Sequence, residues 1–201
     1  MFTGIVQATC KVVSIEAKPG LKVLELDIES YLTQGLKIGA SVAVNGVCLT
    51  VTKHENDSVF FDVMEETLAL TNLNFLKVRD KVNIERSLTF SSEIGGHVLS
   101  GHIQTQAKIV KISNTDEHHN IELEVPSQWM KYIMYKGFIA INGCSLTIGK
   151  IKENKFLIHL IPETLRLTNL ESYSVGDAFN IEIDSQTQAI VNTVERYLKQ
   201  S

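Results

Sequence analysis

The side chains best suited to chemistry are small thiol and hydroxyl groups on two strand-like segments. Cys48 and Thr50 lie in one apolar run, and because side chains alternate along a strand they share one face. Ser145 and Thr147 share a face in the same way in a second run. Such groups bind polar ligands or act as nucleophiles, although a strand hydroxyl is often only solvated and a free cysteine often packs as a small apolar residue.

Two histidines, His97 and His102, form a second group of candidates within the glycine-rich segment 95–103. Glycines beside each ring permit close approach of a ligand to the backbone, and a histidine titrates near neutral pH, so either ring could transfer a proton. Their spacing turns them to opposite faces of a strand, and no cysteine or carboxylate follows at ligand spacing, so we expect no metal site. A structural histidine is the alternative for both.

An internal repeat explains why these groups occur twice. Sliding the sequence by 97 positions without a gap places Glu66–Leu73 on Glu163–Leu170, with seven of eight residues identical. The same offset aligns Val44–Val51 with Ile141–Ile148, Val82–Glu85 with Phe179–Glu182, and Gly4–Gln7 with Gly101–Gln104. A period near 100 residues is that of a whole small domain, so two related folds with two similar ligand surfaces are predicted. His102 aligns with Ile5 and breaks the symmetry, as a catalytic residue would.

The elements that must position these groups are short strands. Runs of β-branched or alternating apolar residues in the first half cover 4–15, 21–28, 40–44, 48–52, 58–63 and 81–85. Asn45-Gly46 and Asn142-Gly143 each separate two runs and fit type I′ turns, which need two positive φ angles. Short helical pieces are expected at Ser127–Tyr135 and in the Glu-Thr-Leu segments. The prediction is an all-β fold of two homologous six-stranded antiparallel Greek-key barrels.

Three parts are predicted along the chain: residues 1–96 and 97–185, each a barrel, and 186–201, a C-terminal helix. After Asp184 the apolar period becomes 3.6 residues, over about Gln186–Lys199. The apolar stripe of this helix consists of Ile190, Val191, Val194, Tyr197 and Leu198. It has no counterpart in the first half, so either a neighbouring subunit or the barrels of the same chain must cover it.

Composition excludes several classes of protein. A net charge of −4 over 201 residues, with no cluster of Lys or Arg, opposes a nucleic-acid or anionic-membrane surface. The hydrophobic content of 44%, without an apolar run near the length of a bilayer span, predicts a soluble chain, and no signal or transit peptide is visible. Cys10, Cys48 and Cys144 fit free thiols in a reducing compartment. We therefore expect a cytoplasmic protein with a small-molecule partner.

Taken together, these motifs resemble the riboflavin synthase family, alpha chain, over residues 1 to 195. The resemblance is carried by Met1–Val6, Asn45–Val51, Gly95–His97, Ser100–His102, Met134–Phe138, Ser145–Thr147, Ile161–Thr164 and Ile183–Asp184. It implies a homotrimer whose C-terminal helices form the contact and whose active sites span subunits. It also suggests association with lumazine synthase.

The same resemblance implies the reaction. One molecule of 6,7-dimethyl-8-ribityllumazine transfers a four-carbon unit to a second, giving riboflavin and 5-amino-6-(D-ribitylamino)uracil in the last step of riboflavin biosynthesis. No cofactor takes part. Two like substrates suit a duplicated fold, and holding them together lowers the entropic barrier of a bimolecular step.

Site residues follow from the resemblance. The first half-site would use Gly4, Ile5, Val6, Cys48, Leu49, Thr50, Asp62, Val63, Met64, Glu65, Glu66 and Thr67. The second would use Gly101, His102, Ile103, Lys136, Ser145, Leu146, Thr147, Ile161, Pro162, Glu163, Thr164, Leu165 and Arg166. His102 would transfer protons at the acidic 7-methyl group, supported by Ser145 and Asp184. Cys48 and Ser41, or a bound water, would supply or position the nucleophile, and Phe2 would lie near the first half-site.

Two other functions are compatible with a two-barrel fold. A non-catalytic lumazine or flavin antenna protein shares the family fold, but in that relative the second half has lost its ligand-binding residues and the histidines, whereas both halves keep their motifs here. An oligonucleotide-binding barrel is opposed by the acidic charge and the lack of a basic aromatic groove.

Overall fold

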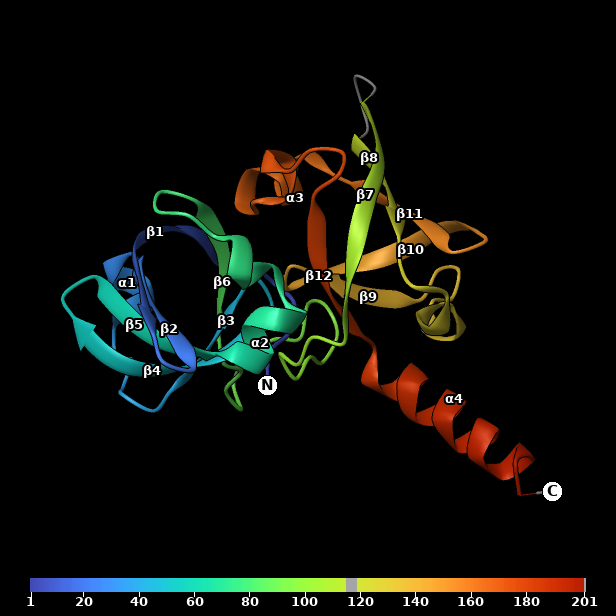
Figure 1. Cartoon of the computed structure of the whole chain (residues 1–201), viewed down its shortest axis with the longest axis horizontal. Helices are drawn as coiled ribbons and strands as arrows, with labels where there is room; N and C mark the ends of the chain where they lie inside the picture. The colour runs from blue at the N-terminus through green and yellow to red at the C-terminus, as the bar shows by residue number, and fades with distance from the viewer. Residues whose placement is uncertain (115–118, 201) are drawn as a thin grey trace.

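Two closed β-barrels lie next to each other in the computed structural model, which describes residues 1–114 and 119–200 (Figure 1). The first barrel contains β1 (Ala8–Lys18), β2 (Leu21–Asp27), β3 (Ser41–Val44), β4 (Val47–Glu55), β5 (Ser58–Met64) and β6 (Lys81–Arg86), in the order β1-β2-β5-β4-β3-β6. The second contains β7 (Thr105–Asn114), β8 (His119–Glu124), β9 (Phe138–Ile141), β10 (Cys144–Lys152), β11 (Lys155–Leu160) and β12 (Ala178–Ile183), in the order β10-β11-β8-β7-β12-β9. The prediction of two six-stranded antiparallel barrels is confirmed.

Helical segments are short except for the last one. They are α1 (Ser30–Thr33), α2 (Glu65–Leu70), α3 (Pro162–Leu167), α4 (Ser185–Leu198) and three 3-10 turns, η1 (Asn72–Phe75), η2 (Ser127–Tyr132) and η3 (Leu170–Ser172). The Glu-Thr-Leu helices, the C-terminal helix and a short helical piece at Ser127, which is a 3-10 helix ending at Tyr132, were expected. Helix α1 was not foreseen. No helix in the described part of the chain is both long and apolar enough to cross a bilayer.

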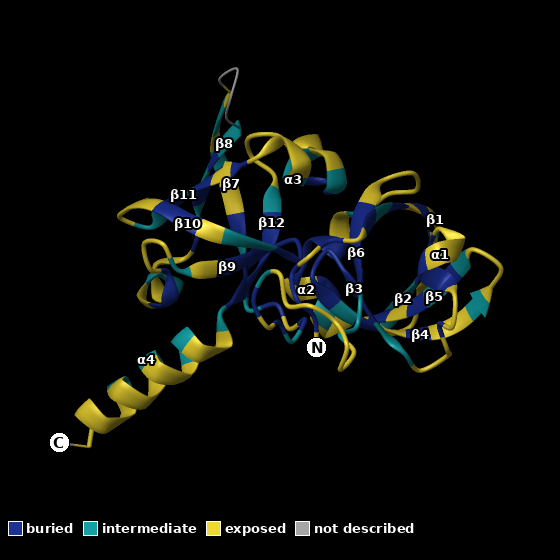
Figure 2. Cartoon of the chain, turned by 180° about the vertical axis from the view of Figure 1, so that it is seen from behind, coloured by how far each residue is buried: buried dark blue, intermediate teal, exposed yellow. Residues whose placement is uncertain are grey.

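Each barrel has its own apolar core, formed by the inward side chains of its strands. Figure 2 shows buried residues, in dark blue, along the strands of both barrels. Leu26 and Phe61 are fully buried in the first core, and Ile121 and Phe179 are fully buried in the second. Each such side chain contributes about 1.5–3 kcal/mol when it leaves water. The alternation of apolar residues along the strands therefore gives two barrels, each with a core of its own.

The two Asn-Gly turns meet at the junction of the barrels. Asn45 and Gly46 have φ angles of 46° and 79°, and Asn142 and Gly143 have 44° and 79°, which confirms the expected left-handed turn geometry. A Cβ atom on Gly46 would stand 2.6 Å from the backbone nitrogen of Gly143. The turns are thus buried hairpin tips in mutual contact, and only glycine fits there.

Six buried asparagines surround these turns, three from each half at equivalent repeat positions: Asn45, Asn72 and Asn83, and Asn142, Asn169 and Asn180. The side chain of Asn83 donates to the carbonyl of Asn142 (2.9 Å), and that of Asn180 donates to the carbonyl of Asn45 (3.0 Å). Each bond crosses from one barrel to the other. The local twofold relation between the barrels is therefore held by reciprocal hydrogen bonds.

The segment before each barrel, residues 2–6 in the first half and 99–103 in the second, crosses to the opposite barrel. We call these two stretches the crossing segments. Phe2 and Leu99, which are repeat equivalents, form an antiparallel bridge with two backbone hydrogen bonds of 2.9 Å. Beyond this bridge Val6 packs into the core of the second barrel and Ile103 into the core of the first. The expectation that the first strand begins at Gly4 is wrong, because Gly4 has a φ of 75° and β1 begins only at Ala8.

Helix α4 extends away from both barrels (Figures 1 and 2). Asp184 caps its first turn by accepting from Thr187 N (2.9 Å), and Lys131 bonds Glu195 farther along. Val191 packs partly against the second core. The rest of the stripe, including Ile190 at 64% and Leu198 at 66% exposure, is not covered by the barrels of its own chain.

Gly46→Ala should destabilise the chain by about 2–5 kcal/mol, because a positive φ and a collision with Gly143 add together. The matched control is Gly20→Ala, since Gly20 has the same φ of 79° but no atom within 4 Å of the added carbon. Urea unfolding monitored by circular dichroism measures both free energies. Equal losses of unfolding free energy in the two variants would show that contact between the turns contributes nothing to stability.

Candidate active site

Each barrel opens where its fourth and fifth strands separate. The ladder between β4 and β5 begins at Val51 opposite Phe61, and the ladder between β10 and β11 begins at Ile148 opposite Ile158. Residues 48–50 and 145–147 lie just before these points and pair with the preceding strand, β3 or β9. Backbone and side-chain groups at both ends are thus placed to contact a polar ligand.

The crossing segments close the free edges. Cys48 N donates to the carbonyl of Gly101 (2.8 Å), and Ser145 N donates to the carbonyl of Gly4 (2.8 Å). A Cβ atom on Gly101 would stand 2.5 Å from Cys48 Cβ, so the approach requires glycine. The expected grouping of Gly4–Val6 with Cys48 is therefore wrong: each of these glycine segments lies on the barrel of the other half.

The barrel-1 surface, which we define as Ser41, Cys48, Thr50, Asp62–Thr67 and Gly101–Ile103, carries hydroxyl, thiol and carboxylate groups. Ser41 pairs with Thr50 across the β3–β4 ladder. Cys48 is half-buried and Thr50 exposed, whereas Leu49 points into the core, which confirms the expected alternation. Val63 is also in the core, so only its backbone can reach a ligand. His102 is exposed at the end of the crossing segment.

The barrel-2 surface, defined as Gly4–Val6, His97, Lys136, Ser145–Thr147 and Ile161–Arg166, contains a histidine–serine pair. His97 Nδ1 lies 2.6 Å from Ser145 Oγ, and the imidazole stacks on Phe138 with ring centroids 5.1 Å apart. His97 is only 7% exposed, and its Nε2 has no hydrogen-bond partner among the residues that the structure describes. Burial lowers the pKa of His97 below the ordinary value of 6.5, although the charge of Asp184 opposes this shift.

Asp184 supports this pair through its charge while it caps α4. Burial by itself would raise its pKa, but hydrogen bonds from Thr187 and Gln186 and the charge of His97 hold the pKa below its ordinary value. The carboxylate therefore stays ionised. It favours the protonated form of His97 once a proton arrives.

Lys136 and residues 161–166 form the outer part of the barrel-2 surface. Lys136 has a φ of 63°, a conformation that its repeat equivalent Gly39 reaches without strain at 87°. A lysine at such a position carries backbone strain that a glycine avoids. Glu163 and Arg166 are exposed and form an ion pair of 2.6 Å.

Two sequence-based assignments need correction. Residues 95–98 and 100–104 form no strand, so the parity argument that turned His97 away fails, and His97 is the histidine in contact with Ser145. Phe2 is 1% exposed between the barrels and packs with Leu99, so its side chain faces neither surface. We therefore assign Phe2 to packing.

Sequence reasoning missed the carboxylates that hold the crossing segments. Glu85 accepts hydrogen bonds from the backbone and hydroxyl of Thr3, and Glu182 does the same for Ser100. Both lie in strands whose residues are nearly all buried. The sequence signal that could have identified these carboxylates is the same acidic residue at equivalent positions of two apolar strands.

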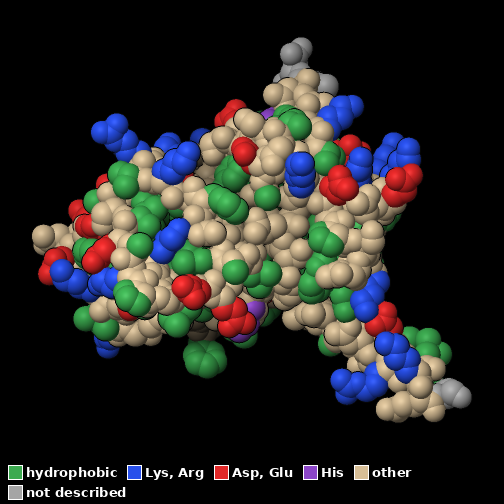
Figure 3. All heavy atoms as spheres, in the orientation of Figure 1, with side chains coloured by type: hydrophobic (Ala, Val, Ile, Leu, Met, Phe, Trp, Pro, Cys, Tyr) green, Lys and Arg blue, Asp and Glu red, His purple; other side chains and the backbone are tan. Residues whose placement is uncertain are grey.

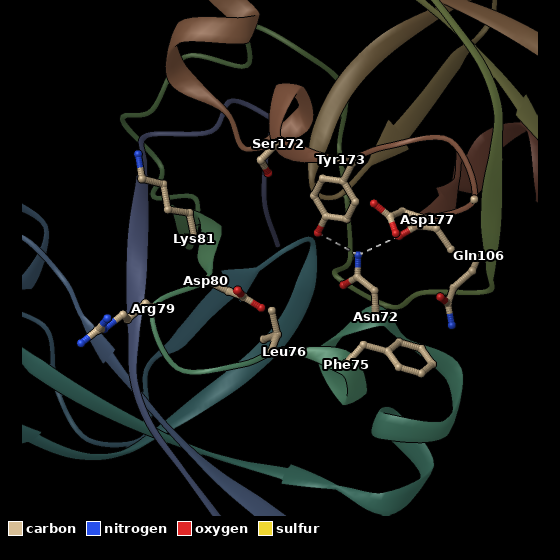
Figure 4. Close-up of a pocket in the computed structure, with 12 residues that line it drawn as sticks. Asn72, Phe75, Leu76, Arg79, Asp80, Lys81, Gln106, Ser172, Tyr173 and Asp177 are labelled. Atoms are coloured by element: carbon tan, nitrogen blue, oxygen red, sulfur yellow. Dashed lines mark hydrogen bonds between the residues drawn. The ribbon is translucent and has the colours of Figure 1, made fainter.

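A cavity of about 960 Å³ also opens between the barrels, away from both surfaces (Figure 4). Its walls pair repeat equivalents across the local twofold axis: Phe75 with Ser172, Leu76 with Tyr173, Arg79 with Gly176, Asp80 with Asp177, and Lys81 with Ala178. Asn72 lies beside Tyr173 there (3.4 Å) and belongs to the asparagine network. The cavity is thus a by-product of the duplicated junction.

Charge and ligand geometry add two observations. Acidic and basic side chains are interspersed over the face seen in Figure 3, in keeping with the absence of a basic cluster in the sequence. Within residues 1–114 and 119–200, no three His, Cys, Asp or Glu side chains are grouped to hold a metal ion. Cys10, Cys48 and Cys144 are free thiols, as expected.

Comparison with known proteins defines the class. The lumazine binding domain family matches residues 3–87 and again residues 100–184, so each barrel with its crossing segment corresponds to one domain. The chain is 53% identical to riboflavin synthase of Escherichia coli (strain K12), over 98% of this chain and 93% of that protein. It is 40% identical to riboflavin synthase of Chlamydia pneumoniae, over 100% and 98%. The chain therefore belongs to the riboflavin synthase family of lumazine-binding proteins.

The fold is also similar to that of LumP in complex with riboflavin. The TM-score is 0.84 at 28% identity, covering 91% of this chain and 99% of LumP. A second LumP structure, in complex with 6,7-dimethyl-8-(1'-D-ribityl) lumazine, gives a TM-score of 0.83 at 26% identity over the same shares of the two chains.

Proposed function

We propose that this chain catalyses the dismutation of two molecules of 6,7-dimethyl-8-ribityllumazine. One molecule gives a four-carbon unit to the other, and the products are riboflavin and 5-amino-6-(D-ribitylamino)uracil. The atoms of the two substrates balance those of the two products, so no external co-reactant is required. The assignment rests on the riboflavin synthases to which the chain is 40–53% identical over nearly its whole length.

The observation that carries the mechanism is that the two surfaces have the same backbone design but different chemistry. On both surfaces, the end of a strand is hydrogen-bonded to the glycine of a crossing segment from the other half. Cys48 stands on one surface where Ser145 stands on the other, and only Ser145 contacts a buried histidine. Two copies of one substrate can therefore bind similarly and react in different roles.

The His97–Ser145 pair is the proton acceptor in this proposal. Burial keeps His97 neutral near pH 7, so its ring can receive a proton that leaves the acidic 7-methyl group and passes through Ser145 Oγ. Asp184 then stabilises the imidazolium ring. The proton returns to the ring system that leaves as the diaminouracil product.

Groups on the barrel-1 surface serve the other substrate. Cys48 and Ser41 position or activate the nucleophile, and a bound water is the alternative. His102 stays the predicted proton-transfer residue for this surface, where its side chain is exposed. Glu66, Glu163 and the threonines of both surfaces bind the ribityl hydroxyls.

Assembly is part of the same proposal. The uncovered stripe of α4 contacts its counterparts in a homotrimer, and the barrel-1 surface of one subunit faces the barrel-2 surface of the next. The protein acts in the cytoplasm, where its free thiols stay reduced. Lumazine synthase, which supplies the substrate, is the expected partner enzyme.

The alternative function is that of an antenna protein that binds a chromophore without chemistry, because LumP shares the fold and is complexed with the same lumazine. The histidine–serine pair on the second barrel favours catalysis.

Incubation of the pure protein with the lumazine alone tests the function. Riboflavin and the diaminouracil should appear in equal amounts, with two substrates consumed for each riboflavin, measured by chromatography. Binding with a change of fluorescence but no product would establish the antenna protein instead.

His97→Gln should lower turnover by roughly 100- to 10,000-fold, the range for a positioned acid or base. In the unchanged protein, turnover should be full above the pKa of His97 and decline as the pH falls through it, at a pH below 6.5, because protonation removes the acceptor. His102→Gln is the matched control and should keep this acidic decline. Loss of the decline in His102→Gln alone would identify His102 as the acceptor.

Deletion of residues 186–201 should yield monomers with little activity, since the stripe of α4 would be lost from the subunit contact. The double change Ile190→Ser and Leu198→Ser removes apolar area from the two exposed positions and should give the same result with the helix in place. Analytical ultracentrifugation reports the mass. An intact trimer in both variants would rule out α4 as the contact.

A further inference from the structure

Two buried carboxylates occupy equivalent places at the ends of the last strands. Glu85 in β6 is 5% exposed, and Glu182 in β12 is 3% exposed. A buried carboxylate is costly unless hydrogen bonds satisfy it. These two are satisfied by the crossing segments, and neither is used in the mechanism above.

Glu85 holds the segment that leads to the barrel-2 surface. Its Oε1 accepts from Thr3 N (2.6 Å) and Thr3 Oγ1 (2.7 Å), and its Oε2 accepts from Gly4 N (3.0 Å). The carbonyl of Thr3 then accepts from His97 N (3.1 Å), and the carbonyl of Gly4 accepts from Ser145 N (2.8 Å). The Glu85 carboxylate of the first barrel is thus connected through Thr3 to His97, and through Gly4 to Ser145, on the second barrel.

Glu182 does the same in the opposite direction. Its Oε1 accepts from Ser100 N (2.7 Å) and Ser100 Oγ (2.8 Å), and its Oε2 accepts from Gly101 N (3.0 Å). The carbonyl of Gly101 accepts from Cys48 N, and Ser100 Oγ also receives His102 N (3.2 Å). The second barrel thereby positions the thiol and the histidine of the barrel-1 surface.

We propose that Glu85 and Glu182 are crossed positioning residues: each sets the reactive groups on the barrel opposite its own. The inference rests on the proposed function, because it gives these groups their catalytic meaning. Burial raises the pKa of both carboxyls, while the hydrogen bonds from Thr3, Ser100 and the two glycines oppose the shift. The donors therefore favour the charged form that accepts three hydrogen bonds.

The alternative is a local role, in which each carboxylate only stabilises the strand that carries it. The two cases differ in which surface responds to a substitution. Glu85→Gln keeps the shape of the side chain but turns an amide hydrogen toward donors that need an acceptor. A displacement near 1 Å in a reactive group costs about 100-fold in rate, so kcat should fall roughly 10- to 100-fold with little change in KM.

Thiol alkylation by iodoacetamide gives a separate readout for each surface. Burial raises the pKa of Cys10 and Cys144 to about 12, so these two thiols do not react in the folded protein near neutral pH. Cys48 reports the barrel-1 surface. A Cys48→Ser, Ser145→Cys background places a single reporter thiol on the barrel-2 surface.

Alkylation rates, measured by mass spectrometry on the full chain, should change in a crossed pattern. Glu182→Gln should change the rate at Cys48 at least threefold and leave the introduced thiol as before, and Glu85→Gln should do the reverse. Each variant is the matched control for the other. Equal effects at both thiols, or an effect only on the barrel that carries the substitution, would overturn the proposal.

A second pair of variants keeps the test decisive if Glu85→Gln does not fold. Thr3→Val removes the hydroxyl that donates to Glu85, and Thr3→Ser should restore most of the kcat lost in Thr3→Val. Failure of the serine variant to restore kcat would also contradict the proposal. The proposed function is tested separately by protection with riboflavin: if riboflavin slows neither reporter in the parent proteins, that function fails, whereas the crossed rates without ligand still decide the positioning.

Discussion

The hydrogen bonds among six buried asparagines are the constraint on which the rest of the structure depends. The two barrels have separate cores, and beside the apolar contacts of the segments that cross between them their relation is set by directional bonds between the Asn-Gly turns. Asn83 and Asn180 satisfy the turn carbonyls of the opposite barrel, and Asn72 N and Asn169 N each donate to a side chain across the junction. In a site of low dielectric such bonds are strong, and an unpaired amide is costly.

The symmetry of this network is close but incomplete. Asn45 Nδ2 donates to Asn72 Oδ1 at 3.4 Å, whereas the equivalent atoms, Asn142 Nδ2 and Asn169 Oδ1, do not make the equivalent bond in the described part of the chain. Tyr173, which replaces Leu76 in the repeat, lies next to this half of the junction. A local difference in side-chain size is thus accommodated in the network, while the positions of both barrels are kept.

Duplication accounts for the chemistry as well as the architecture. A symmetric junction places two copies of one ligand surface on one chain, and substitutions at a few equivalent positions then make the surfaces unequal. Ser145 stands where the first half has Cys48, and His97 contacts Ser145 on the second surface. In the proposed reaction two identical molecules bind to related surfaces, and only the one at the barrel-2 surface loses a proton to His97.

Local patterns determined much of this protein. The repeat, the strand runs, the positive φ of the Asn-Gly turns and the outward faces of Cys48 and Ser145 follow from the sequence, because a period of two residues and the conformational freedom of glycine act over short distances. The family resemblance predicted the ligand-binding segments. Equivalent residues of the two halves can therefore be paired from the sequence alone.

Only the tertiary structure decided which half each segment serves. A repeat shows that Gly4 and Gly101 are equivalent, but it is equally consistent with each glycine packing on its own barrel or on the other one. The bridge between Phe2 and Leu99, fixed by Glu85 and Glu182, selects the crossed arrangement. His97 was misplaced for the same reason: its contact with Ser145 joins residues 48 positions apart, and such a contact depends on how the barrels meet, which no local period encodes.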